Sequence, residues 1–145
     1  MGGRYRERVR PYASVLMREP EEMDDVLLPV KEQGFQAFKI GWGPFGRKNM
    51  VTDEAIVDAA REAVGPDCLL MVDAGASDAF WPQNYKWALR TAEMLAAYDV
   101  AWFEEPLHPD ALDDYVALRR AARVPIAGGE CLTRRQGLKQ ASAVC

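Results

Sequence analysis

The sequence predicts an α/β fold in which about five strand–helix units form a parallel sheet, as part of a (β/α)8 TIM-type barrel. Short apolar runs alternate strictly with amphipathic helical patterns, at intervals of about 30 residues. Gly, Pro or Asn separates most of these segments. Alternation of this kind is typical of parallel strands covered by helices, either in a barrel or in an open doubly wound sheet.

The first strand is expected over residues 9–17, and the helix after it begins near Pro20, which suits a first helical turn. One apolar stripe at positions i, i+3, i+4 and i+7 follows: Met23, Val26, Leu27 and Val30. Pro29 is expected to kink or shorten this helix, and Gly34 to end it. The second strand, residues 35–40, ends at a Gly-Trp-Gly-Pro turn.

Thr52 is the expected cap of the second helix, which ends at Gly65 and precedes a third strand over residues 68–72. Asn84 is expected to cap the third helix, which runs to Ala97. Its inward stripe consists of Trp87, Thr91 and Leu95.

The fourth strand is expected over residues 100–103, before a helix capped by Asp110. The fifth strand covers residues 124–127, and a last helix starts at Thr133. These five units are fewer than the eight of a closed barrel, which needs about 250 residues.

Three of the predicted strands are each followed by a carboxylate: Asp73, Glu104 and Glu130. Because the loops after parallel strands share one face, we expect these side chains to converge there. Three anions around one point repel one another unless a cation lies between them. Mg²⁺ is the simplest such cation. Each acid taken alone could equally be a loop residue or a helix cap.

The composition narrows the class of protein. The 145 residues are 49% hydrophobic and 28% charged, with a formal net charge of −4. An acidic chain with scattered Lys and Arg disfavours nucleic acid and anionic membranes as partners. No apolar run reaches the roughly 20 residues that span a bilayer. The N-terminus lacks the apolar segment of a signal peptide, and three cysteines without zinc spacing suit a reducing cytoplasm, so we expect a cytoplasmic protein.

Several short motifs follow one another at intervals that fit the predicted units. They are Gly2-Gly3, Phe38-Lys39-Ile40-Gly41, Met71-Val72-Asp73, Trp102-Phe103-Glu104-Glu105-Pro106 and Gly128-Gly129-Glu130. Together they resemble the C-terminal barrel domain of the enolase superfamily, in its mandelate racemase and muconate lactonizing enzyme group. Within that group, the sugar-acid dehydratase branch is the most similar.

This resemblance implies Mg²⁺ ligation by Asp73, Glu104 and Glu130. It also implies that Lys39 acts as the base toward the proton next to a substrate carboxylate. Ala37 stands where a first lysine of a Lys-x-Lys pair would be, so a two-lysine arrangement is absent. Gly75 stands where many members carry an asparagine that supports the metal.

The resemblance also implies that residues 1–145 form a partial barrel domain of a truncated chain. The N-terminal capping domain and the last barrel units, which usually supply a second acid or base, are then expected to be absent. The expected substrate is a small hydroxy-carboxylate such as a sugar acid, and the expected reaction is Mg²⁺-dependent abstraction of its α-proton followed by loss of water.

A racemase or epimerase of the same superfamily is the nearest alternative to a dehydratase. A different class is a non-catalytic metal-binding remnant, or a half-barrel that associates with itself through its strand edges to form a homo-oligomer. A third alternative is an open sheet that binds phosphate, but the sequence lacks the glycine-rich loop motif that such a site needs. An aldolase-like barrel using Lys39 as a Schiff base leaves the three acids without a role.

Overall fold

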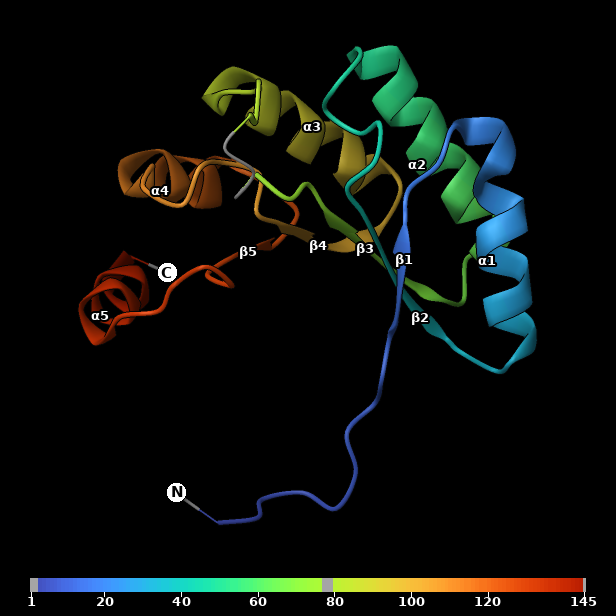
Figure 1. Cartoon of the computed structure of the whole chain (residues 1–145), viewed down its shortest axis with the longest axis horizontal. Coiled ribbons are helices and arrows are strands. Elements are labelled where there is room, and N and C mark those ends of the chain that lie inside the picture. Colours follow the sequence, from blue (N-terminus) through green and yellow to red (C-terminus); the bar gives the residue numbers. More distant parts are fainter. Residues whose placement is uncertain (1–2, 77–79, 145) are drawn as a thin grey trace.

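The computed structural model describes residues 3–76 and 80–144. Five strands form one parallel sheet in the order β1-β2-β3-β4-β5, and a helix follows each of them (Figure 1). The strands are β1 Ala13–Leu16, β2 Ala37–Gly41, β3 Leu69–Asp73, β4 Val100–Glu104 and β5 Ile126–Ala127. The helices are η1 Pro20–Glu22, α1 Met23–Glu32, α2 Met50–Val64, α3 Tyr85–Ala97, α4 Leu112–Ala121 and α5 Arg135–Val144. The predicted α/β fold with about five parallel units is therefore confirmed.

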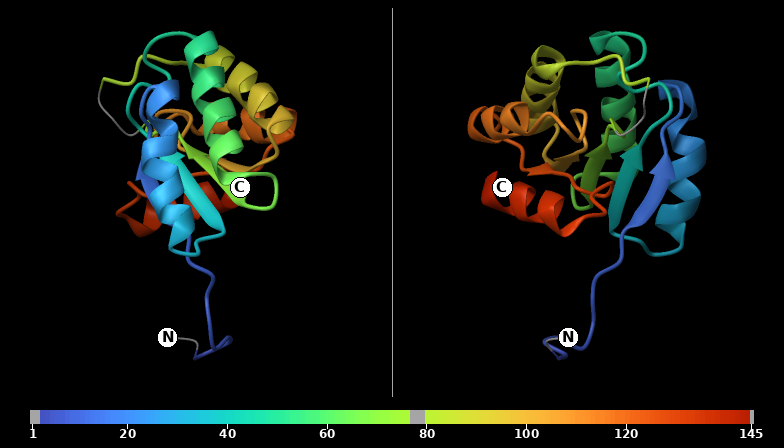
Figure 2. Two further views of the ribbon diagram at one scale, coloured as in Figure 1. Left: turned by 90° about the vertical axis from the view of Figure 1, so that its right-hand side faces the viewer. Right: turned by 60° about the vertical axis from the view of Figure 1, so that its left-hand side comes forward.

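The sheet is curved, and the two views of Figure 2 show α1 to α4 packed along its outer face. The hydrophobic core lies between these helices and the sheet, and includes Leu27, Phe38, Ile56, Leu95 and Phe103. Helix α5 contacts α4, the last of these four helices. Within residues 3–76 and 80–144, no helix has the length and apolarity that a membrane crossing requires.

Helix boundaries follow local capping, and two predicted caps were wrong. Helix α2 is capped by Asn49, whose side chain accepts from the Thr52 N–H, so Thr52 lies inside the helix. Asn84 caps α3 as predicted and accepts from the Lys86 and Trp87 N–H groups. Asp110 does not cap α4.

Several other boundaries also differ from the expectation. Helix α4 is preceded by Ala111 without a side-chain cap, and α5 begins two residues after Thr133. Strand β5 keeps only the last two of its four expected residues, and β1 begins at Ala13 rather than at residue 9. Helix α1 continues through Pro29 to Glu32. Pro11 and Pro125 lie among the residues left outside β1 and β5, and a proline has no N–H to give to a strand ladder.

Among the described residues, the inner face of the sheet carries exposed apolar side chains. Leu16 is 62% exposed and Leu69 is 43% exposed. Strand register places both on the same face as Lys39, because Leu16 pairs with Gly41 and Leu69 with Ala37. Self-association through such a face stays a prediction.

Arg61 holds together two turns at the N-terminal edge of the sheet. The three acidic residues predicted to bind metal lie at the opposite edge, where the strands end. Its guanidinium donates to the backbone carbonyls of Gly65, Cys68, Tyr98 and Asp99 at 2.8–3.0 Å. These carbonyls lie in the two turns that precede β3 and β4. A single side chain therefore holds both turns against α2.

Arg61→Met is expected to lower the free energy of unfolding by roughly 2–4 kcal/mol, since four charge-assisted hydrogen bonds are lost and the site is partly screened by water. Urea unfolding followed by circular dichroism measures this. Arg61→Lys is the matched control and should recover only part of the loss, because an ammonium has three donors and no planar fork. A methionine variant as stable as the unmodified chain would show that water replaces the guanidinium at no cost.

Candidate metal centre

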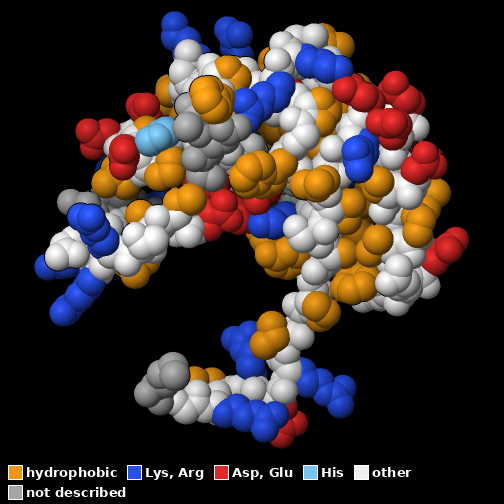
Figure 3. Space-filling model, in the orientation of Figure 1, with side chains coloured by type: hydrophobic (Ala, Val, Ile, Leu, Met, Phe, Trp, Pro, Cys, Tyr) orange, Lys and Arg blue, Asp and Glu red, His pale blue; other side chains and the backbone are white. Residues whose placement is uncertain are grey.

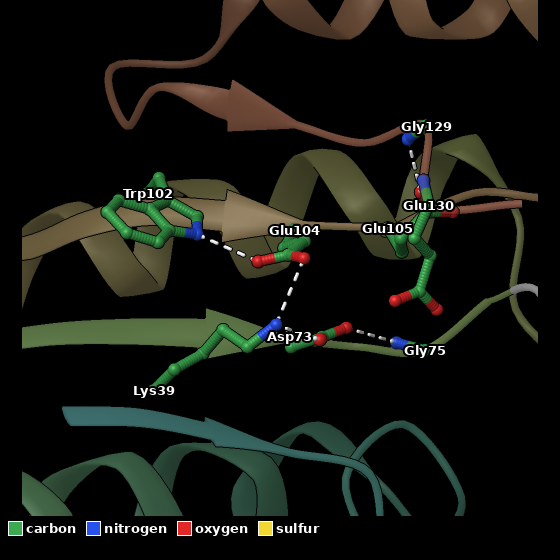
Figure 4. A network of polar contacts seen from close by, with 8 residues as sticks. All are labelled: Lys39, Asp73, Gly75, Trp102, Glu104, Glu105, Gly129 and Glu130. Atoms are coloured by element: carbon green, nitrogen blue, oxygen red, sulfur yellow. Dashed lines mark hydrogen bonds and ion pairs between the residues drawn. The ribbon is translucent and has the colours of Figure 1, made fainter. Parts of the chain in front are cut away.

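Strand register brings the predicted acids to one edge of the sheet. Asp73 ends β3 and is directly paired with Glu104, which ends β4. Glu130 lies in the loop after β5, and Figure 4 shows its carboxylate pointing toward Asp73. One oxygen from each of the three carboxylates lies within 4.8 Å of the others. Figure 3 shows acidic and basic side chains together at this position, where the surface is hollowed.

Lys39 lies between two of these acids. It pairs with Met71 on β3, so its side chain rises on the same face as Asp73, two residues further along. Its Nζ is 2.8 Å from Asp73 Oδ2 and 3.0 Å from Glu104 Oε1. Burial acts to lower the pKa of Lys39, but its hydrogen bonds and charge interactions with the two carboxylates outweigh this and raise the pKa above its usual value. Lys39 is therefore an ammonium in this arrangement.

Other groups fix how the carboxylates are turned. Asp73 Oδ1 accepts from the Gly75 N–H at 3.0 Å, and Glu104 Oε2 accepts from Trp102 Nε1 at 3.0 Å. The sequence motifs include Trp102, but its contact with Glu104 was not predicted. The spacing of Trp102 and Glu104 could have indicated this contact, because residues two apart on a strand lie on the same face of the sheet.

Trp42 explains why residue 75 is a glycine. Gly75 has a φ of +66°, and a Cβ there would lie 2.9 Å from the Trp42 ring. Trp42 itself has a φ of +63° and donates its N–H to the Asp73 carbonyl at 3.1 Å. An asparagine at position 75 would therefore displace the indole, so the backbone N–H of Gly75 is what supports Asp73 here.

The donor set suits a hard divalent cation. Carboxylate oxygens are the ligands that Mg²⁺ prefers, at about 2.0–2.1 Å. Such bonds place neighbouring ligand oxygens roughly 3 Å apart, so the present spacing must close somewhat around an ion. Asp73 is buried, Glu104 is half-buried and Glu130 is exposed, so the residue with the most room to move is Glu130. The residues present therefore fit a magnesium ion.

Comparison with known proteins agrees with the fold. A family model described as enolase C-terminal domain-like matches residues 22–143. A D-galactarolactone cycloisomerase of Agrobacterium fabrum is 35% identical over 97% of this chain and 36% of its own length. An L-talarate/galactarate dehydratase of Salmonella typhimurium is 32% identical over 77% of this chain and 27% of its own length.

A solved structure shows the same architecture with a metal bound. It is an enolase from Bradyrhizobium complexed with magnesium and mandelic acid, with a TM-score of 0.79 and 29% identity. The match covers 94% of this chain and 36% of that one. The chain thus spans about a third of the length of these relatives.

Proposed function

The chain belongs to the enolase C-terminal domain-like family, and on that premise we propose that its metal centre serves to abstract the proton next to the carboxylate of a sugar acid. One observation carries this proposal. Three carboxylate oxygens lie within 4.8 Å of one another, and the Lys39 amine contacts two of the three carboxylates. A cluster of hard anions beside a single amine provides both a cation site and a base.

Asp73, Glu104 and Glu130 would hold the ion, as Mg²⁺. When bound, Mg²⁺ supplies Lewis-acid stabilisation of the negative charge that develops on the substrate carboxylate. The enolase superfamily is itself the standard example of this strategy, with a lysine or histidine base. Trp102 and Gly75 keep two of the three carboxylates turned toward the centre, so little reorganisation is needed.

Lys39 is the proposed base. Its Nζ holds a proton tightly while it is paired with Asp73 and Glu104 alone. It releases that proton more readily when the same carboxylates share their charge with a divalent ion, because the attraction that raised its pKa is then offset. The free amine can then accept the α-proton of a substrate that lies beside it.

The fate of the substrate after proton loss determines the product. If a β-oxygen leaves as the C=C bond forms, an open-chain sugar acid loses water and gives a keto acid. If that oxygen is part of a ring, the same cleavage opens the ring and gives an isomer. Dehydration and cycloisomerisation thus share one elimination. The cycloisomerase similarity, which extends over nearly the whole chain, favours a cyclic sugar acid beside the open-chain one.

Proton exchange in D₂O tests this function. With Mg²⁺ present, we expect loss of the α-proton NMR signal and formation of a 2-keto acid from galactarate or D-galactarolactone. Mandelate lacks a β-leaving group, so exchange with mandelate alone would indicate a racemase or epimerase instead. No exchange with any acid, alongside normal Mg²⁺ binding, would contradict the enzymatic proposal and leave a metal-binding remnant.

A further inference from the structure

Glu105 is a buried acid that the proposed reaction does not use. It follows Glu104 at the end of β4 and is only 1% exposed. Its φ of +47° lies in the left-handed region, which costs a residue with a Cβ about 1 kcal/mol. Burial of its carboxylate is also unfavourable and raises the pKa of Glu105. A residue that carries both costs must be held by its neighbours, and strained residues of this kind concentrate at functional sites.

The backbone of Glu105 ties together the loops around the metal centre. Its N–H donates to the Ala127 carbonyl at the end of β5, at 3.0 Å. Its carbonyl accepts from the Ala76 N–H at 2.9 Å, in the loop that follows Asp73. One residue thus joins the ends of β3, β4 and β5.

The side chain of Glu105 holds the loop that carries Glu130. Its Oε1 accepts from the backbone N–H groups of Gly129 and Glu130. Gly129 has a φ of +112°, which allows the loop to turn its amides inward toward this oxygen. Figure 4 shows the Glu105 contact above the point where the Glu130 side chain descends toward Asp73.

The second oxygen of Glu105 has a different environment. Oε2 is buried and has no hydrogen-bond partner among the described residues. The useful interactions of this carboxylate are therefore those of Oε1, which needs the length of a glutamate side chain to reach the loop. A glutamine at this position could supply the same acceptor oxygen. Its NH₂ group would then lie where Oε2 now lies, and no hydrogen-bond donor among the described residues faces that point.

We propose that Glu105 is a positioning residue that presents Glu130 to the metal, acting through the backbone of residues 129–130 and not as a ligand. The proposal rests on the metal centre of the proposed function. Positioning would depend on the length of the Glu105 side chain and on its ability to accept hydrogen bonds. Metal ligation would depend instead on its negative charge.

Two substitutions distinguish these properties. Glu105→Gln keeps the reach and removes the charge, and Glu105→Asp keeps the charge and removes one methylene of reach. Aspartate also tolerates the left-handed backbone, so this variant is expected to fold. Titration with Mn²⁺, followed by electron paramagnetic resonance, should show affinity within about threefold for the glutamine variant. For the aspartate variant we expect a loss of about 10–100-fold, as is typical when a partner of a metal ligand is removed. The opposite order would overturn the positioning role.

A double-mutant cycle tests whether Glu105 acts through Glu130. In a Glu130→Gln background, Glu105→Asp should add less than about a threefold loss of Mn²⁺ affinity, because the ligand it positions is gone. An undiminished loss in that background would mean a general structural effect and would contradict the proposal.

Amide hydrogen exchange gives a readout that needs no metal. In the metal-free chain, the Gly129 and Glu130 amides should exchange faster in Glu105→Asp and at nearly the normal rate in Glu105→Gln. Unchanged exchange in the aspartate variant would overturn the positioning role. By contrast, failure of the unmodified chain to bind Mn²⁺ would overturn the proposed function, so the two failures are distinguishable.

Discussion

Lys39→Met is expected to lower the rate of α-proton exchange by at least about a hundredfold, because it removes the proposed general base. Methionine keeps an unbranched side chain of similar length, so the packing against the Tyr12 ring, 5.7 Å from Nζ, should persist. Binding of Mg²⁺ should not weaken, since the ammonium that pairs with Asp73 and Glu104 is a competing positive charge. Exchange in D₂O and calorimetric titration with Mg²⁺ measure the two quantities.

Lys39→Arg separates the charge of this residue from its basicity. Arginine can keep ion pairs with the two carboxylates, but it does not lose its proton at any pH at which the protein is folded. We therefore expect exchange to be as slow as in the methionine variant. Near-normal exchange in the arginine variant would show that another group takes the proton, and the role of Lys39 would reduce to pairing with the acids.

The convergence of the acids was predictable because it depends on topology alone. Parallel strands with helical crossovers put the residues after β3, β4 and β5 at one edge, and strand register then sets Asp73 opposite Glu104. Lys39 was predicted from the family resemblance, and the register of β2 with β3 places it on the same face as Asp73. The exact pairing of Asp73 with Glu104 also depends on a register shift between Leu70 and Val72, which element order does not predict.

The surroundings of the acids could not be predicted in the same way. The contact between Trp102 and Glu104 depends on a side-chain rotamer, and the left-handed backbone of Glu105 has no glycine to mark it. The start of α2 was missed because Asn49 and Thr52 are both residue types that cap helices, three positions apart. Both residue types are compatible with a cap, and in the structure the Asn49 side chain accepts from the Thr52 N–H.

Asp73→Asn is expected to weaken Mg²⁺ binding by well over about a hundredfold. Loss of an outer partner alone typically costs about 10–100-fold in metal affinity, and this change removes the charge of a proposed ligand. Asp73 is 3% exposed, so water cannot readily take its place. The amide oxygen can still accept from the Gly75 N–H, so the turn after β3 should keep its conformation. The effect is therefore assigned to charge and ligand loss, not to a collapsed loop.

Thermal unfolding with and without Mg²⁺ provides the measurement, because an ion that binds only the folded state raises the midpoint in proportion to the logarithm of its concentration over Kd. The unmodified chain should show this rise and Asp73→Asn should lose it. Asp67→Asn makes the same chemical change in the exposed turn before β3, at the opposite end of the strand, and alters the net charge equally. If both variants lost the rise alike, the ion would be responding to the overall negative charge of the chain. If only Asp73→Asn loses it, the ion is held at the C-terminal edge of the sheet, beside the amine of Lys39.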